Sequence, residues 1–339
     1  DRLPPVDLGT GAVAEDVTAG GQFTCVVAEG GRAKCFGNGW AGQLGNGRMD
    51  HIGDEPGEMG DALVPADLGD GLRVTQASAG FDHTCFILVN DEGFQGLKCV
   101  GSADYGKLGS SDYTIKFLGH AEGWTGDAVP LVDLGDEAVP EQVSCGLHHT
   151  CAVIRGGALK CWGGSDGGQL GLGVKEPQGI GMNKLIFEMG DELPKVYLGW
   201  WASTRSVAAG AHHTCALVTD GLAKCFGSNA YGQIGAKEVN ESEYALRGWD
   251  VPDSGVPPAL GDEAEEMGDD LPPVAVFESC LPPADLAEAE VAMATVVPAT
   301  LLAVCVVAAY LVSMAGPVRW WRWLVARAKA KAGRADGVV

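Results

Sequence analysis

The chain has 339 residues, of which 46% are hydrophobic, and a formal net charge of −22. Its length accommodates one large all-β domain of roughly 250 residues with segments to spare. With 51 glycines and 9 phenylalanines, the composition favours many short strands joined by glycine turns. Six of the 23 basic residues lie beyond residue 318, so residues 1–290 hold 17 basic and 44 acidic residues. A body with a net charge of −27 repels phosphate backbones, so we expect no nucleic acid as a partner.

Four sequence segments repeat, as in AGAHHTCALVTDGLAKCFGSNAYGQIGAK from Ala209, and their first cysteines stand at 25, 85, 151 and 215. The periods are therefore 60, 66 and 64, which indicates a repeat architecture. Apolar runs on both sides of Asp220-Gly221 predict two antiparallel strands with a tight hairpin. The later glycines predict a further turn, since no segment carries the GK plus Ser or Thr of a phosphate loop. The repeat cores lie near 17–47, 75–109, 143–173 and 207–235.

A second unit, as in GDAVPLVDLG from Gly126, lies between the cores and occurs five times for four cores. Its prolines suit an edge strand or the entry to one, where no ladder N–H is required. The surplus copy predicts that the array continues before Asp1, or that an end strand completes a blade begun at the other end. Because the chain opens inside this unit without Met or a signal peptide, we expect a processed chain or part of a longer one.

Read in order, the patterns AGxxHTCAL, KCWGxNxxGQLG and LPxVDLG resemble the regulator-of-chromosome-condensation repeat family, in a cysteine-containing form. The resemblance covers residues 1 to about 276 and implies four-stranded blades of a β-propeller, typically with seven blades. With four cores, a complete small ring, an open arc and part of a larger ring are all open. The nucleotide-exchange activity known in the family is not carried over, because no matching exchange-site residues are found.

Eight of the eleven cysteines form local pairs, and the spacing is 10 in three pairs and 14 in the fourth, where the turn is longer. This symmetry about a variable turn predicts four disulfides between paired strands: Cys25/Cys35, Cys85/Cys99, Cys151/Cys161 and Cys215/Cys225. Buried reduced thiols are the alternative. Disulfides imply an oxidising compartment. Cys145 and Cys280 remain outside the membrane segment and could pair with each other, and no CxxC or clustered Cys/His suggests zinc.

Three histidines, His83, His149 and His213, precede the Thr-Cys of their repeats, and Phe23 takes that place in the first repeat. A position that accepts Phe is a packing position first, so we expect a structural role. Adjacent side chains on a strand point to opposite faces, which argues against metal binding by neighbouring histidines. Asn240 begins a glycosylation sequon, and an unused chance match is equally open.

Residues 291–318 contain no charged side chain, and about 20 such residues suffice to cross a bilayer. We therefore expect a linker at 277–290, a transmembrane helix at 291–318 and a basic tail at 319–339. Arg319, Trp320, Trp321, Arg322 and Trp323 are the expected interface anchors. The basic tail places the C-terminus on the cytoplasmic, stromal or matrix side and the repeats in the extracellular space, secretory lumen, thylakoid lumen or intermembrane space.

The function that these patterns favour is that of a non-catalytic, membrane-anchored propeller, acting as an interaction scaffold or accessory subunit of a larger membrane complex. A surface or lumenal receptor that binds through its loops is the alternative. An enzyme with a site in the central channel is least favoured, because the sequence has no repeated carboxylate pair, GxSxG, HExxH or cofactor loop. We thus expect other membrane-complex subunits and the lipid bilayer as partners and no metal or cofactor, with a small-molecule ligand left open.

Overall fold

The structure is a computed structural model that describes residues 3–112, 114–173, 189–235, 259–260, 266–269 and 271–274. The chain separates into two compact units, residues 1–276 and 277–339, and all described residues belong to the first. The expected linker, membrane span and basic tail therefore lie outside the described residues, as do Asn240 and Cys280. Among the helices of the described residues, none is long and apolar enough to span a bilayer.

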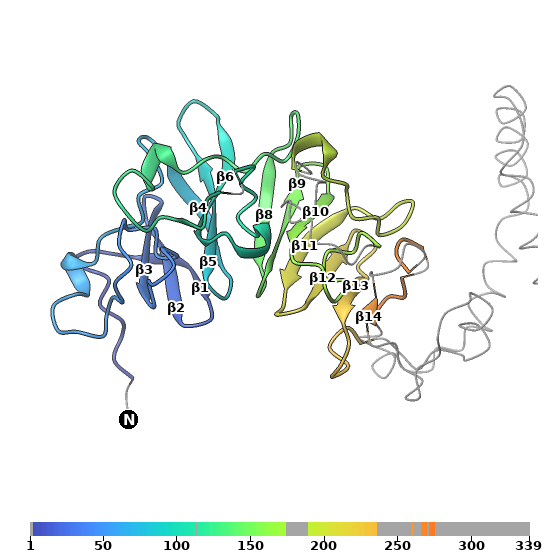
Figure 1. The fold of residues 1–339 in the computed structure, drawn as a ribbon, viewed down its shortest axis with the longest axis horizontal. Coiled ribbons are helices and arrows are strands. Elements are labelled where there is room, and N and C mark those ends of the chain that lie inside the picture. Colours follow the sequence, from blue (N-terminus) through green and yellow to red (C-terminus); the bar gives the residue numbers. More distant parts are fainter. Residues whose placement is uncertain are drawn as a thin grey trace, which may run out of the picture. The chain divides into compact units, whose positions relative to one another are not determined.

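Four antiparallel sheets follow one another in chain order, each built around a hairpin that carries a cysteine on both strands (Figure 1). The first blade contains β1 (Ala14–Ala19), β2 (Phe23–Ala28) and β3 (Arg32–Gly37). The second contains β4 (Arg73–Ala79), β5 (His83–Val89), β6 (Gln95–Ser102) and β7 (Phe117–Leu118). The third contains β8 (Pro140–Cys145), β9 (His149–Ile154) and β10 (Ala158–Gly163). The fourth contains β11 (Thr204–Ala209), β12 (His213–Val218), β13 (Ala223–Ser228) and β14 (Ala259–Leu260).

The helices of the described residues are four 3-10 turns, namely η1 (Gly60–Ala62), η2 (Asp104–Gly106), η3 (Gly126–Ala128) and η4 (Gly190–Glu192). The predicted all-β repeat architecture is thus confirmed for the described part of the chain. The family resemblance implied four strands in every blade. Among the described residues, the second and fourth sheets have a fourth strand of two residues and the first and third have three strands, and residues 174–188, which follow β10, lie outside the described part.

The proline-containing units lie beside the outer strands, where the described residues form two isolated bridges, at Leu131 and Pro273, and single hydrogen bonds instead of the predicted edge strands. Leu131 bridges to Lys98, and the N–H of Val132 donates to the carbonyl of Leu97 at 2.8 Å. The preceding residue, Pro130, has no N–H to extend this ladder. A 3-10 turn immediately before it also bends the chain away from an extended course.

A buried lysine precedes the second cysteine of every repeat and explains the number of proline-containing units. Nζ of Lys160 donates to the carbonyl of Leu134 at 2.8 Å and to the carbonyl of Gly190 at 2.7 Å. Leu134 belongs to the preceding unit and Gly190 to the following one. The same double bond recurs at Lys34, Lys98 and Lys224. Four lysines that each join two successive units require five units. The fifth unit therefore has a function within the four blades, which neither predicted explanation, a longer array or a blade completed by an end strand, had included.

Successive blades share the hydrophobic core. β2 packs against β4, β5 against β8 and β9 against β11. Phe86 and Trp162 are fully buried within the cluster that spans the first three blades, and Phe226 is fully buried in the cluster of the third and fourth. Among the described residues, strands of one blade pack only against strands of the next blade along the chain. The four blades therefore form an open series in this part of the chain.

Candidate interaction site at the blade ends

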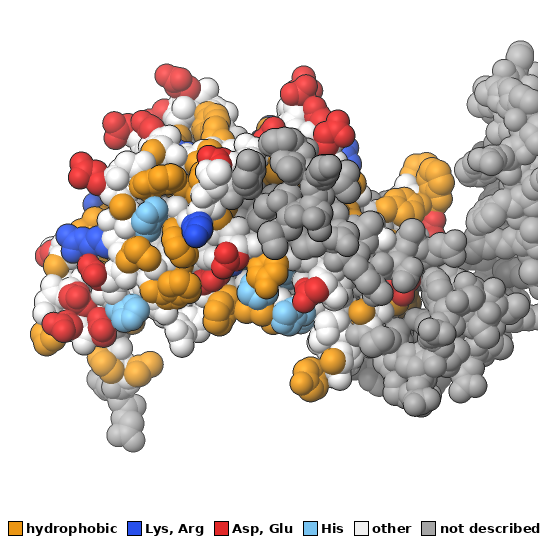
Figure 2. Space-filling model, in the orientation of Figure 1, with side chains coloured by type: hydrophobic (Ala, Val, Ile, Leu, Met, Phe, Trp, Pro, Cys, Tyr) orange, Lys and Arg blue, Asp and Glu red, His pale blue; other side chains and the backbone are white. Residues whose placement is uncertain are grey.

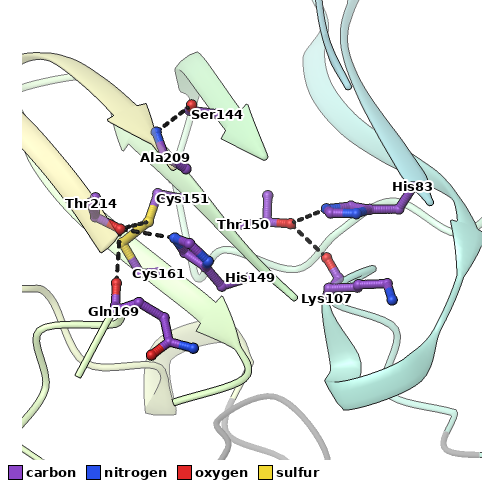
Figure 3. Close-up of a disulfide and its surroundings, with 10 residues drawn as sticks. All are labelled: His83, Lys107, Ser144, His149, Thr150, Cys151, Cys161, Gln169, Ala209 and Thr214. Carbon is purple, nitrogen blue, oxygen red and sulfur yellow. Dashed lines mark hydrogen bonds between the residues drawn. A yellow bond between two sulfur atoms is a disulfide. The ribbon is translucent and has the colours of Figure 1, made fainter. Parts of the chain in front are cut away.

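Two histidines each join one blade to the next through a threonine (Figure 3). Nε2 of His83 lies 3.0 Å from Oγ1 of Thr150, which donates its proton to the carbonyl of Lys107 at 2.8 Å. His149 makes the same bond to Thr214 at 2.9 Å, and Thr214 donates to the carbonyl of Gln169. Because a hydroxyl has a single proton, each histidine must donate from Nε2. This assigns the Nε2–H tautomer to both rings.

Burial keeps both of these rings uncharged. It lowers the pKa of His149 to about 3 and holds the pKa of His83 well below its ordinary value, helped by the positive charge of Lys107. Nδ1 of each ring is buried and has no hydrogen-bond partner among the described residues. Phe23 fills the same position in the first blade and is also buried. The histidines therefore serve packing and blade-to-blade bonding, which agrees with the expected structural role.

The four cysteine pairs predicted from the spacing are disulfides in the structure, so the alternative of buried reduced thiols is wrong for these eight residues. In each pair the two cysteines stand directly opposite each other across the hairpin. Each disulfide fixes the register of its hairpin. Figure 3 shows the Cys151–Cys161 disulfide beside Thr214, which takes part in a blade-to-blade hydrogen bond. The S–S distances are 2.05 Å in Cys25–Cys35, 2.07 Å in Cys85–Cys99, 2.13 Å in Cys151–Cys161 and 2.08 Å in Cys215–Cys225.

Among the described residues, Cys145 is the free cysteine, and it is buried. The suggested partner of Cys145, Cys280, lies outside the described residues. Burial raises the pKa of the Cys145 thiol to about 12, so the thiol stays protonated. Ligand atoms of Cys145, His83 and Cys85 lie within 4.8 Å of one another. Because Cys85 is already bonded to Cys99, this group offers no thiolate pair for a metal ion.

The residue before His83, His149, His213 or Phe23 lies in the loop that precedes the second strand of its blade, and we call these four equivalent positions a row. The row consists of Gln22, Asp82, His148 and His212. The ring of His148 lies 4.5 Å from the ring of Tyr105 in the second blade and 6.3 Å from the ring of His212 in the fourth. Three blades thus contribute to one continuous set of side chains. We call this row, together with the exposed aromatic residues described below, the blade-end face.

A buried ion pair supports the row at the second blade. Nζ of Lys107 lies 2.8 Å from Oδ1 of Asp82, and both side chains are almost inaccessible. The other repeats carry Gln at the position of Lys107, namely Gln43, Gln169 and Gln233. Burial and the charge of Lys107 together lower the pKa of His148. The imidazole of His148 is therefore neutral at physiological pH, and it presents a stacking and hydrogen-bonding surface instead of a charge.

Large exposed hydrophobic side chains surround this row. They are Trp40, Phe81, Tyr105 and Tyr231, all from the loops at the same end of the four blades. Exposed carboxylates of Asp104 and Asp166 lie in the same loops. Figure 2 shows histidine, acidic and hydrophobic side chains gathered near the middle of one face. Exposed aromatic residues with a polar rim are typical of protein-interaction surfaces.

Three long segments, residues 101–128, 173–189 and 236–266, follow the predicted hairpins of the last three repeats and are the loops through which the sequence predicts binding. The first of these contributes Tyr105 and Lys107 to the blade-end face, whereas residues 174–188 and 236–258 lie outside the described residues. The row itself was missed. Its one signal in the sequence is that the position before His83 carries Asp in the same repeat that carries Lys107 in place of Gln.

Comparison with known proteins agrees with this fold. Residues 205–233 match the family described as regulator of chromosome condensation (RCC1) repeat. The ultraviolet-B receptor UVR8 of Arabidopsis thaliana is 28% identical over 221 residues, which cover 65% of this chain and 42% of that protein. The E3 ubiquitin-protein ligase HERC2 of Homo sapiens is 26% identical over 248 residues, which cover 71% of this chain and 4% of that protein.

Among solved structures, yeast RCC1 (Prp20) bound to Kap60 is similar, with a TM-score of 0.52 and 22% identity. The match covers 69% of this chain and 48% of that one, so it supports a shared fold. The chain thus spans less than half the length of each of these three proteins. One repeat, residues 205–233, thus matches the regulator-of-chromosome-condensation repeat family, and the described blades share the fold of the yeast propeller.

Proposed function

We propose that this chain is a non-catalytic propeller that binds another protein through its blade-end face. The observation that carries the proposal is the pair of ring contacts that joins Tyr105, His148 and His212 across three blades, with further exposed aromatic side chains in the same loops. A rigid surface loses little conformational entropy when a partner binds. The yeast relative in the solved structure is bound to Kap60, which supports a protein as the partner.

The chemistry of the face suggests the kind of partner. Tyr105 and Tyr231 offer aromatic area, neutral His148 offers hydrogen bonds, and Asp104 and Asp166 provide negative charge around them. A partner with an apolar centre and a basic rim is complementary to this arrangement. The ligase activity of HERC2 is not carried over, because the match covers only 4% of that protein.

We further propose that residues 291–318 hold the propeller at a membrane as an accessory subunit of a larger assembly, with the repeats on the oxidising side. The charge-free run of 28 residues and the basic tail support the anchor, and the four disulfides support the compartment. After alkaline extraction of membranes, the full chain should stay in the pellet, and a variant truncated after residue 290 should be released. Release of the full chain would remove the anchor from the proposal.

The binding proposal is tested by purifying the full chain from membranes with its co-purifying proteins. The face variant carries Phe81→Ser and Tyr231→Ser. The matched control carries Trp200→Ser and Trp201→Ser, which removes two exposed aromatic residues from a turn outside the face. We expect the face variant to lose at least tenfold of one stoichiometric partner and the control to retain it. Equal recovery with both variants would overturn the blade-end face as the binding site.

A further inference from the structure

A short turn precedes the first strand of every blade, and its side chains differ in the fourth blade. The turn reads GTGA from Gly9, GDGL from Gly69, GDEA from Gly135 and GWWA from Gly199. Trp200 is 78% exposed and Trp201 is 89% exposed, more than any other tryptophan of the described residues. Two large aromatic side chains therefore stand in the fourth blade where the other blades carry small or polar ones.

The exposure of these tryptophans belongs to the turn and does not depend on which blades lie beside it. The third blade has a neighbouring blade on each side, and Asp136 and Glu137, which occupy the equivalent positions there, are exposed as well. The backbone of the two turns is also alike. The N–H of Ala202 donates to the carbonyl of Gly199 at 3.2 Å, and Ala138 makes the same bond to Gly135. A further blade packed on the fourth would therefore leave the turn open.

The tryptophan turn lies at the end of the fourth blade that is opposite to the blade-end face. β11 begins at Thr204, next to the turn, and ends at Ala209, next to the loop that holds His212. A strand of this length spans about 20 Å. A surface that binds the turn therefore leaves His212 and the rest of the row free.

The same turn is bonded to the last described segment of the chain. The N–H of Trp200 donates to Oδ1 of Asp269 at 3.3 Å, and the hydroxyl of Tyr197 donates to Oδ2 of that carboxylate at 3.3 Å. Residues 275–290 separate this segment from the charge-free run at 291–318. The blade that carries the tryptophan turn is thus the blade that the chain tethers most closely to the proposed membrane segment.

We propose, on the basis of the membrane anchor proposed above, that Trp200 and Trp201 dock on the headgroup region of the same bilayer and turn the blade-end face away from it. Indole rings favour membrane interfaces because they combine an apolar body with an N–H donor. Lys195 and Arg205, which are exposed close to the turn in sequence, place cationic ends within reach of headgroup phosphates. The lipid is zwitterionic, because an anionic surface repels a body with a net charge of −27.

Two side chains suffice for this contact because the anchor already holds them near the lipid. A tryptophan buries about 150–250 Å² of surface, and two of them on a free peptide would bind a bilayer weakly and reversibly. A tether makes the contact intramolecular and gives it a high effective concentration. The turns of the other blades offer no comparable area, so the fourth blade alone is expected to face the lipid.

The test is hydroxyl-radical footprinting of the purified full chain in phosphatidylcholine nanodiscs, without partner proteins. Mass spectrometry gives the oxidation rate of each residue relative to the chain unfolded in urea. Trp200 and Trp201 should be oxidised at least fivefold more slowly than in the unfolded chain. Tyr231 is the internal control, because it is 95% exposed at the blade-end face and should keep its full rate.

A variant that carries Trp200→Ser and Trp201→Ser should oxidise Tyr197, beside the turn, at least threefold faster than the native chain in nanodiscs. Trp40→Ser removes an exposed tryptophan from the blade-end face and should leave the rate of Tyr197 unchanged.

The remaining outcomes separate the docking from the anchor. A chain that does not enter the nanodiscs would remove the anchor and the docking together. A chain that enters them with Trp200 and Trp201 as reactive as Tyr231 would overturn the docking and leave the anchor in place. Protection that requires a co-purifying protein would likewise overturn it, since the pair would then bind protein instead of lipid.

Discussion

Nε2 of His149 lies 2.9 Å from Oγ1 of Thr214, and this bond fastens the third blade to the fourth. Its counterpart between His83 and Thr150 fastens the second blade to the third. Both rings are buried, and Nδ1 of each has no partner among the described residues. A proton added at Nδ1 would therefore place an uncompensated charge between two blades. Blade-to-blade packing is thus coupled to pH.

The folded domain should lose stability as the pH falls below about 6.5. The pKa of His149 is lowered to about 3 in the fold, so below its ordinary value the unfolded chain binds a proton that the folded chain does not. Each such histidine costs about 1.4 kcal/mol of unfolding free energy per pH unit in this window, and the contribution of His149 levels off near its folded pKa. Urea unfolding at pH 7.5, 6 and 5 measures the slope, to which His83 and His149 both contribute.

Replacing His149 with Phe should reduce this slope by the contribution of one proton. The first blade already carries Phe23 at the equivalent position, and Thr84 beside it still donates to the carbonyl of Gln43 at 2.8 Å. The fold therefore tolerates the change. An exposed control, His51→Phe, should leave the slope unaltered. If His149→Phe and His51→Phe gave the native slope alike, the coupling of His149 to folding would be wrong.

Lys160→Met should destabilise the domain by about 2–4 kcal/mol, since it leaves the two buried carbonyls of Leu134 and Gly190 without their donor. Met retains the length and apolar stem of lysine, so the loss reports the ammonium group. Lys195→Met removes an exposed lysine nearby in sequence and should cost less than about 0.5 kcal/mol. Equal midpoints for the two variants in guanidinium unfolding would contradict the bridging function of Lys160.

The hairpins and cysteine pairs could be predicted from the sequence because both partners lie within one repeat, 10 or 14 residues apart. The function of Lys160 could not be predicted, because its acceptors are backbone carbonyls 26 and 30 residues away and leave no side-chain pattern. The blade-end face could not be predicted from the sequence for the same reason. Tyr105 and His148 meet only once two blades are packed, and the sequence offers no local signal for that contact.

Removing one disulfide should destabilise the domain without changing its blades. Cys151→Ala with Cys161→Val eliminates a cross-link that closes a short loop, and loop entropy predicts a loss on the order of 2–3 kcal/mol. Thermal unfolding measures the loss of stability, and peptide mapping without reduction shows which disulfides remain. The other three linkages should be recovered intact. Loss of the Cys85–Cys99 linkage in this variant would mean that the hairpins do not form independently of one another.

The ion pair of Lys107 and Asp82 allows a stricter test, because the chain itself contains the replacement. Asp82→His alone leaves a buried ammonium group without its carboxylate and should cost about 3–5 kcal/mol. Lys107→Gln alone leaves the buried carboxylate unpaired and should also destabilise. The carbonyl of Lys107 still accepts from Thr150 in either variant, so the blade-to-blade bond persists.

Asp82→His combined with Lys107→Gln converts the second blade to the side chains of the third, where His148 and Gln169 occupy the same positions. Because neither residue 82 nor residue 107 then carries a buried charge, the double variant should regain most of the stability that either single variant loses. A double-mutant cycle by urea unfolding should therefore give a coupling energy of about 2 kcal/mol or more. Additive losses would show that the two charges are solvated independently, and the blade-end face would then lack the rigid support on which its proposed binding function depends.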